Sequence, residues 1–349
     1  MRRLKSKSIL FRITSVLPLM LPNAAYATKA KLLSLQGADF LIDSQTVFEN
    51  PSDIHALGNY FTLELGGSAA NSSPKAEGGL FQEMSGAQVG FYLGHMSAEQ
   101  TTFRTLNNFL LEENPIDFFY ARGNWGASIG ISQSDKKTSD ESQQTIVGRY
   151  GITDGPLNAW ANLELISKAD KGNDEYQGAP VLRAGASYVK GQYFFSAKLN
   201  YGKIENKISG TTTKVDLTGI ELLALDRSIK TNQATIYFGP GLKWQEVKVG
   251  NAKISNMSLP MYAGIEHKYF DWLDFRASVS QNFLIGSTKD ETNAAPGDKA
   301  DSIANNTTVA AGIGIQQENL SIDATLTASN TGEFNGNSIL ANLGMIYNF

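Results

Sequence analysis

The sequence has 349 residues and no cysteine, so its fold must be stable without disulfides. Charged residues make up 18% of it, below the roughly 25% of an average soluble domain. No stretch after residue 27 supplies the roughly 20 consecutive apolar residues of a membrane-spanning helix. If the chain enters a membrane, it therefore has to cross as a closed β-barrel, in which every backbone polar group is paired within the sheet.

Histidine is also scarce. His95 and His267 share strand parity with apolar residues and are expected to face lipid, and His55 lies in an irregular stretch. No two histidines are spaced i, i+4, and cysteine is absent, so the sequence predicts no metal site and no cofactor. No histidine is placed to act with a serine or a pair of carboxylates, so we expect no enzymatic activity.

The first 27 residues have the three parts of a secretory signal peptide. Basic residues come first, a largely apolar run from Ser8 to Leu21 follows, and Ala25-Tyr26-Ala27 places small residues at the cleavage positions. We therefore expect residues 1–27 to be removed and the chain to be exported to the cell outer membrane. The alternative is a basic, flexible arm. Without residues 1–27 the chain keeps 25 basic and 34 acidic residues, a net charge of −9, which argues against nucleic acid as a partner.

Residues 59–349 show the period-two alternation of β-strands with one apolar and one polar face. The clearest case is Asn124–Ser134, in which Trp125 and Ile129 share the apolar face. Sixteen such segments can be counted if the weak, glycine-rich Glu77–Met84 is included. Near Gly219–Leu223 the alternation slips, and we predict a β-bulge there.

Short turns and longer polar connections alternate along this part of the chain, a rhythm typical of bacterial outer-membrane barrels. We therefore predict an all-β fold, a transmembrane antiparallel up-and-down β-barrel of 16 strands. The alternative is 14 strands, with two weak N-terminal strands belonging to the segment before the barrel. A soluble β-sandwich also stays open, and it would bury Trp125, Ile129, Leu163, Phe195 and Leu343 between two sheets.

The last stretch, Asn337–Phe349, alternates regularly and has Tyr347 two residues before the final Phe349. It resembles the terminal strand of bacterial outer-membrane β-barrels. The resemblance implies contact with outer-membrane lipid and lipopolysaccharide, and recognition of the strand ending in Phe349 by the barrel-assembly machinery. The alternative is the edge strand of a sandwich.

Residues 28–58 do not alternate, and we expect them to form a periplasmic plug or hatch of the barrel. Asn50 and Pro51, the candidate plug residues, form a turn or helix-start signal. The stretch around them resembles an Asn-Pro-small motif near the N-terminus of the long-chain fatty-acid transporter family, in which an N-terminal hatch fills the barrel. The alternative is a capped turn that precedes the first strand.

The polar parity of the strands holds the residues that would line an aqueous lumen. The pore-lining candidates are basic and acidic residues of this parity: Arg149, Arg183, Lys198, Arg276, Glu164 and Asp274.

The segment 97–114 has apolar residues at helical spacing and predicts a short amphipathic helix. It resembles in role the loop that narrows general porins, which makes Arg104, Glu112 and Glu113 candidates for a constriction. The alternative is a surface helix that caps the barrel.

From these features we expect a channel for passive diffusion of small hydrophilic solutes, as in porins. Two alternatives stay open. One is a transporter of hydrophobic substrates of the fatty-acid type, with residues 28–58 as its hatch; inward-facing Phe119, Trp160 and Phe194 would suit it. The other is a structural or adhesive barrel with a plugged lumen.

Overall fold

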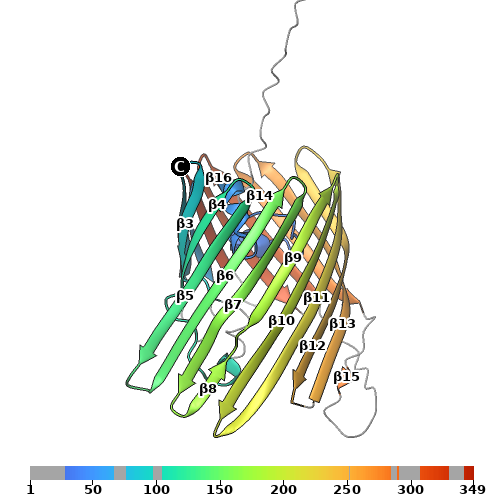
Figure 1. Ribbon diagram of the computed structural model, residues 1–349. Helices are drawn as coiled ribbons and strands as arrows, with labels where there is room; N and C mark the ends of the chain where they lie inside the picture. Colours follow the sequence, from blue (N-terminus) through green and yellow to red (C-terminus); the bar gives the residue numbers. More distant parts are fainter. Residues whose placement is uncertain are drawn as a thin grey trace, which may run out of the picture.

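The computed structural model describes residues 28–66, 76–96, 104–250, 252–283, 289–290, 307–329 and 342–349. Across these residues one antiparallel sheet winds round until its last strand pairs with its first, which closes a barrel (Figure 1). At the seam, β1 (Tyr60–Gly66) pairs with β18 (Asn342–Asn348) along its whole length. The predicted antiparallel β-barrel is therefore confirmed.

The other strands follow round the wall, mostly in chain order. They are β2 (Ala76–Met84), β3 (Ala87–Leu93), β4 (Ile116–Arg122), β5 (Trp125–Lys136), β6 (Glu141–Asp154), β7 (Leu157–Lys171), β8 (Asp174–Gln177), β9 (Val181–Lys190), β10 (Tyr193–Ile208), β11 (Thr211–Lys230), β12 (Ala234–Val249), β13 (Ala252–Phe270), β14 (Leu273–Phe283), β15 (Lys289–Asp290), β16 (Thr308–Gln317) and β17 (Leu320–Ser329).

Two of the 18 labelled strands are short continuations of others. β8 and β9 occupy one position, because both pair with β7 on one side and with β10 on the other. β15 continues the position of β14 against β13. In the described residues the wall therefore has 16 positions, as predicted. The alternative of 14 is wrong, because the weak, glycine-rich segment is a complete strand, β2, that pairs with both β1 and β3.

The outward face of the wall is apolar. The five side chains that a sandwich would bury are 37% to 44% exposed: Trp125, Ile129, Leu163, Phe195 and Leu343. The strands of the described residues all belong to the one barrel sheet, so no second sheet lies over these side chains. A continuous apolar outer band is the surface that a transmembrane barrel presents to lipid.

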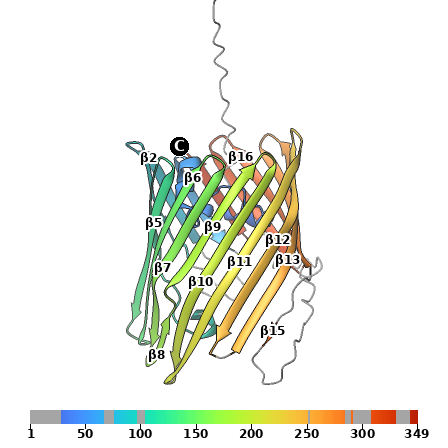
Figure 2. The ribbon, with the colours of Figure 1, turned by 45° about the vertical axis from the view of Figure 1, so that its right-hand side comes forward.

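The apolar band ends at one level on the long strands. β10 to β13 have 16 to 20 residues, whereas β1, β3 and β4 have seven each, so one side of the barrel is taller (Figures 1 and 2). On β10 the outward residue after Tyr201 is Lys203, and on β12 the outward residue after Trp244 is Glu246. Thr218 of β11 lies opposite both Tyr201 and Glu246, so the changes on β10 and β12 are no more than two residues apart along the sheet. Beyond this level the outward residues of these strands include Lys203, Glu205, Glu246 and Lys248, as expected of a wall that extends past the lipid.

Two-residue turns join strands at the end of the barrel where the C-terminus lies, which we call the turn end; the opposite end is the loop end. The turns Gly123-Asn124, Gly155-Pro156 and Gly191-Gln192 each begin with a glycine at a φ of 55° to 63°. This backbone region is open to glycine and strained for most other residues, which explains the residue choice.

The predicted bulge at Gly219–Leu223 is wrong. β11 stays in register with β12 through these residues, and the register shifts only between Asp226 and Ile229. Leu222 faces outward and is 42% exposed, whereas Leu223 faces inward and is 5% exposed. The alternation seemed to slip because the inward face is apolar here, where an aqueous lumen was expected.

Residues 28–58, which we call the inner segment, lie inside the barrel near the turn end (blue in Figure 1). They form four short helical elements: α1 (Lys29–Ser34), η1 (Thr46–Phe48), η2 (Pro51–Asp53) and α2 (Ile54–Leu57). α1 contacts β14, β16, β17 and β18, and η2 contacts β4, β5 and β6. Among the helices of the described residues, none has the length and apolar content needed to cross a membrane.

Candidate functional site in the barrel lumen

Apolar side chains of the inner segment cover apolar side chains of the wall. Two clusters form, the first around Phe48 and the second around Leu35. In the first, Val47, Phe48, Ile54 and Leu57 pack against Tyr60, Phe81, Tyr92, Phe119, Ala121 and Ile346. In the second, Leu35, Ala38, Phe40 and Leu41 pack against Val189, Phe194, Leu223, Leu225, Tyr237 and Tyr262. Inward-facing Phe119 and Phe194 are thus covered by the inner segment.

Asn50 is the centre of a polar contact with the wall and is 1% exposed. Its Oδ1 caps η2 by accepting hydrogen bonds from Ser52 N at 3.0 Å and Ser52 Oγ at 2.8 Å. Its Nδ2 donates to Asn158 Oδ1 on β7 at 2.7 Å and to Thr153 Oγ1 on β6 at 3.2 Å. Pro51 is the first residue of η2, a position that needs no backbone donor. These two candidate plug residues therefore form the joint between the inner segment and the wall.

Two inward glycines make this close approach possible. A Cβ at Gly126 of β5 would come within 2.5 Å of the backbone of Pro51 and Ser52. A Cβ at Gly151 of β6 would collide with the side chain of Asn50. Any side chain larger than that of glycine at either position would therefore collide with residues 50–52 of the inner segment.

Two carboxyl groups of the inner segment are buried without a full countercharge. Burial raises the pKa of Asp53 from 3.8 to about 7, although Thr46, Asn158 and Thr153 bond to it. Burial likewise raises the pKa of Asp43 well above its ordinary value. Docking of the inner segment is therefore favoured when these groups hold a proton.

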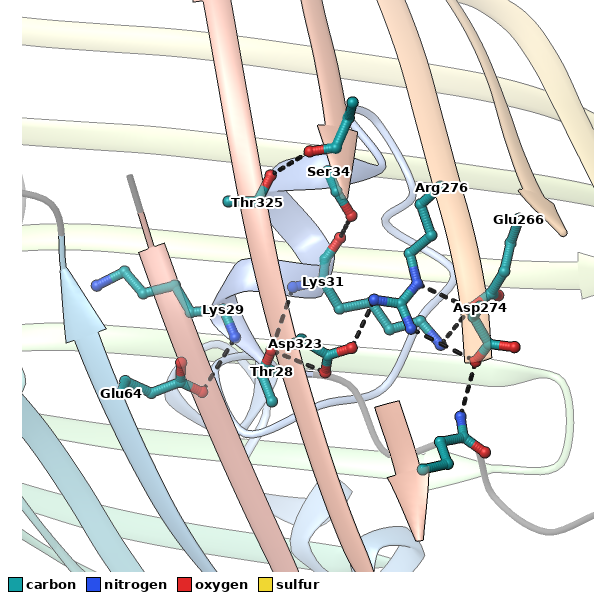
Figure 3. Close-up of polar contacts among 12 residues, drawn as sticks. Thr28, Lys29, Lys31, Ser34, Glu64, Glu266, Asp274, Arg276, Asp323 and Thr325 are labelled. Carbon is teal, nitrogen blue, oxygen red and sulfur yellow. Dashed lines mark hydrogen bonds and ion pairs between the residues drawn. The ribbon is translucent and has the colours of Figure 1, made fainter. Parts of the chain in front are cut away.

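A second polar cluster joins α1 to β13, β14 and β17 (Figure 3). Arg276 of β14 is 4% exposed and donates to Asp323 Oδ1 at 2.5 Å and to Glu266 Oε1 at 3.0 Å. Lys31 Nζ of α1 lies 2.8 Å from the same Glu266 oxygen, and Thr28 Oγ1 donates to Asp323 Oδ2 at 3.0 Å. The charge of Arg276, a predicted pore-lining residue, is thus neutralised inside this cluster.

Asp274 and Lys198, two further pore-lining candidates, lie in different surroundings. Asp274 Oδ2 lies 3.6 Å from Arg276 Nη2 and belongs to the same cluster. Lys198 Nζ of β10 lies 3.1 Å from both Asp39 and Glu49, and these two carboxylates come from the inner segment. Lys198 is therefore a second point at which the wall holds the inner segment by charge.

The remaining pore-lining candidates are found on β6, β7 and β9. Arg149 Nη1 donates to Asp117 Oδ1 at 2.6 Å, and its guanidinium lies 5.4 Å from the centre of the Phe48 ring. Glu164 is 2% exposed, and Arg183 is half-buried opposite Asn162 in the sheet. Arg276 and Asp274 thus share one cluster, while Lys198 and Arg149 have partners elsewhere, so these candidates do not form one charged ring.

Residues 104–114 fold into the barrel from the loop end. Arg104 is fully buried and donates to Thr145 Oγ1 and Ser167 Oγ at 3.0 Å each. Phe109 packs into an inward apolar cluster that includes Tyr176. A helical turn covers residues 104–106, while residues 97–103 of the predicted helix lie outside the described residues.

The two acidic constriction candidates lie at the end of this loop. Glu112 is 7% exposed. Glu113 forms an ion pair with Lys136, and its carbonyl oxygen accepts a hydrogen bond from Ser132 Oγ at 2.7 Å. Glu113 is therefore held against the wall of the barrel, and Glu112 is buried beside it.

A cavity of about 500 Å³ lies between the inner segment and β6, β7, β9 and β10. Its lining is divided by character. The apolar side chains are Phe40, Leu41, Ile42, Trp160, Val189 and Phe194, and the polar ones include Asp39, Glu49, Asn158 and Lys198. A cavity of this size and lining can hold a compact solute with an apolar body and a polar group.

The expectation that His95 faces lipid is wrong. β3 ends at Leu93, and Gly94 follows with a φ of 88°, which turns the chain inward. The His95 ring stacks on Phe48 at 3.4 Å between ring centres, and Nδ1 lies 3.3 Å from Glu77 Oε2. Parity could not place this residue, because parity holds only while a strand continues.

Sequence reasoning also missed the residues that receive the inner segment. Glu64 of β1 accepts hydrogen bonds from Lys29 N at 3.0 Å and Ser44 Oγ at 2.9 Å, and Asp323 binds Thr28 and Arg276. Both have inward parity, but so do many other polar residues. The alternation of these acidic residues with glycine on neighbouring strands was the available signal.

Comparisons with known proteins show likeness in fold only. No described protein family and no curated protein matches the chain. Among solved structures, 83% of this chain aligns with 98% of an anion-selective porin from Comamonas acidovorans at 14% identity and a TM-score of 0.41. The same share aligns with 96% of OmpT, an outer-membrane protein of Vibrio cholerae, at 9% identity and a TM-score of 0.42. It also aligns with 97% of a bacterial polysaccharide outer-membrane secretin at 9% identity and a TM-score of 0.47. These values are too low to indicate a solute, and the likeness of the Asn50-Pro51 stretch to fatty-acid transporters stays a sequence prediction.

Proposed function

We propose that the chain is an exported outer-membrane channel for passive diffusion of small hydrophilic solutes, and that the inner segment closes its turn end in the state described. The observation that supports this is a wall of 16 strand positions whose lumen is filled at the turn end by the inner segment, which is not part of the sheet. A barrel with this number of strands is wide enough to hold water, and the polar residues of its inner face, such as Arg149, Asn158 and Lys198, suit hydrophilic solutes.

The inner segment is attached in a way that permits its release. No strand of the described sheet comes from residues 28–58. Its polar contacts with the wall are made by side chains, such as Asn50 with Asn158 and Lys198 with Glu49. Movement of the inner segment therefore breaks no hydrogen bond of the barrel sheet.

A disulfide lock tests this proposal in planar bilayers. Ser52 Oγ and Thr153 Oγ1 are 2.7 Å apart, so Ser52→Cys with Thr153→Cys places two sulfur atoms within bonding reach. The chain has no other cysteine, so a disulfide within one molecule can only join these two positions. We expect low conductance in the oxidised protein and a higher open probability after reduction. The single Ser52→Cys variant is the control for the loss of the hydroxyl.

The opposite perturbation is Asn50→Ala with Asp53→Ala, which removes the joint on η2. We expect this variant to conduct more and to admit sugars into liposomes faster than the unmodified chain. Equal conductance of the locked, reduced and loosened proteins would refute gating by the inner segment. Absence of conductance and of sugar uptake in all of them would favour the plugged structural or adhesive barrel.

A second candidate function is transport of hydrophobic substrates, and the apolar side of the 500 Å³ cavity favours it. The same liposomes can be given a fluorescent long-chain fatty acid in place of a sugar. Uptake of the fatty acid without uptake of sugar would support this candidate, and Trp160→Ala, which opens the cavity wall, should then change fatty-acid uptake alone.

A further inference from the structure

A row of inward carboxylates crosses the seam where the barrel closes. Neighbouring positions in the row are directly opposite one another on adjacent strands. From β2 to β14 the row consists of Glu77, Glu64, Gly344, Asp323, Gly314 and Asp274. Glu64 and Asp323 are each 2% exposed. Carboxylates this close together and this deeply buried repel one another unless cations match them.

The start of the inner segment supplies part of that match. Lys29 Nζ lies 2.7 Å from Glu77 Oε1. Lys31 Nζ lies 2.8 Å from Glu266, the carboxylate that also pairs with Arg276 (Figure 3). Among the described residues, the cluster then has five carboxylates (Glu64, Glu77, Glu266, Asp274 and Asp323) and four permanent cations (Lys29, Lys31, Arg276 and the exposed Lys268, which lies opposite Asp274). His95, close to Glu77, adds a charge only when protonated. One carboxylate is thus left without a permanent cation. Glu64, at the centre of the row, accepts hydrogen bonds from Lys29 N and Ser44 Oγ and forms no ion pair with a lysine or arginine within the described residues, so the missing positive charge belongs there.

Thr28 is placed to provide it. Its side chain is fully buried, with Oγ1 3.0 Å from Asp323 Oδ2, and the nitrogen of the next residue, Lys29, is 3.0 Å from Glu64 Oε1. The α-nitrogen of Thr28 is three covalent bonds from each of these two atoms, so covalent geometry holds it within about 7 Å of both carboxylates. A Cβ at Gly344, between Glu64 and Asp323 in the row, would collide with both Thr28 and Glu64, so Thr28 lies directly against the seam.

We propose that cleavage after Ala27 creates a charged N-terminus at Thr28, and that this ammonium group completes the cluster and locks the inner segment across the seam. Hydrolysis adds the hydroxyl of water to the carbonyl carbon of Ala27 and leaves the nitrogen of Thr28 as an amine, which takes up a proton at neutral pH. In the uncleaved chain the same nitrogen is a neutral amide and supplies no charge. The proposal does not depend on which solute passes through the barrel.

Two proteins that differ only in this charge provide the test. Both begin at Thr28 and are folded in detergent, one with a free α-amine and the other with an acetylated one. Trypsin cleavage after Lys31, followed by mass spectrometry, measures how often the inner segment leaves the lumen, because Lys31 is 1% exposed when docked. We expect the acetylated protein to be cleaved at least about tenfold faster, because buried carboxylates without their cation destabilise the docked state. Equal rates would overturn the proposal.

Charge variants separate this contact from a general effect of acetylation. Glu64→Gln with Asp323→Asn removes the carboxylates nearest Thr28, so the two N-terminal forms should be cleaved at the same rate. Glu205→Gln, an exposed carboxylate on β10, is the matched control and should keep the full difference. A difference that persists in the first variant would overturn the proposal.

A heat-dependent shift in gel mobility shows whether the acetylated protein has folded. A third protein with a different N-terminus keeps the proposal testable if it has not. A chain that begins at Ala27 keeps a free amine but moves it by one residue, about 3.8 Å along the backbone. We expect faster cleavage than in the chain that begins at Thr28. Equal protection of both chains would show that the position of the charge is unimportant and would contradict the proposal.

Discussion

Gly151→Ala is expected to release the inner segment from the wall, although it adds only one methyl group. The new Cβ would occupy the space of the Asn50 side chain, which has to move away. Gly148→Ala is the matched control on the same strand. Gly148 faces outward, and a Cβ there would meet only Leu165, at an ordinary 3.8 Å.

The expected magnitude follows from the hydrogen bonds that Asn50 loses. Two of them join the inner segment to the wall: Asn50 Nδ2 donates to Asn158 Oδ1 at 2.7 Å and to Thr153 Oγ1 at 3.2 Å. At a net value of about 0.5–1.5 kcal/mol each, their loss weakens docking by about 1–3 kcal/mol. Because about 1.4 kcal/mol is a factor of ten, the released population should rise by roughly 5-fold to 150-fold.

Cysteine labelling measures this population directly. Ala38→Cys places the only thiol of the chain in the inner segment, at a position that is 3% exposed when docked. In this background the rate of maleimide labelling reports how often the inner segment leaves the lumen. We expect Gly151→Ala to raise the rate by the factor above and Gly148→Ala to leave it nearly unchanged. Equal rates in the two variants would refute the idea that an inward glycine seats Asn50.

Three further predictions concern charge and the two faces of the wall. Asp53 has a pKa of about 7 when docked and 3.8 when released, so docking should weaken as pH rises from about 4 to 7, by no more than about 4 kcal/mol. Maleimide labelling of the Ala38→Cys protein should therefore be faster at pH 8 than at pH 5. Asp53→Asn should flatten this pH dependence, and an unchanged slope would contradict the assignment to Asp53. Arg276→Met leaves Asp323 and Glu266 without their main cation and should lower the free energy of unfolding by about 3–5 kcal/mol in urea titrations. Lys203→Met, on the exposed outer face, should change it little. Similar losses in both variants would show that the buried cluster is unimportant for stability. Trp125 lies on the outer face of the wall and Trp160 lines the cavity. Brominated lipids should therefore quench the fluorescence of a protein that keeps only Trp125 and leave that of a protein that keeps only Trp160 unquenched. The reverse pattern would contradict the assignment of the outer and inner faces.

Period-two alternation was sufficient to predict the wall from the sequence. It placed Trp125, Ile129 and Leu343 on the outer face and gave the correct number of strands, because each strand of a barrel keeps one face toward lipid over its whole length. It failed at His95, where the strand had already ended, and at Leu223, which is apolar and faces inward. Both failures lie where the inner segment replaces water in the lumen.

The arrangement inside the barrel could not be predicted in the same way. The inner segment has no periodicity, and its contacts join residues far apart in the chain, such as Asn50 with Asn158. Six pore-lining candidates had the same inward parity, yet Arg276 lies among carboxylates and Lys198 binds the inner segment. Parity predicts which face of the wall a side chain lies on, and it carries no information about the residues that the side chain contacts.

The sequence by itself determined a closed wall with an apolar outside, since that depends on local alternation and on the need to pair every backbone group in lipid. Only the tertiary structure decided what fills the wall. The alternation does not distinguish Gly126 and Gly151 from other inward positions, yet the backbone of Pro51 and Ser52 approaches the wall closely at Gly126, and the Asn50 side chain does so at Gly151. Close approach is a property of two surfaces in contact, so neither surface reveals it alone.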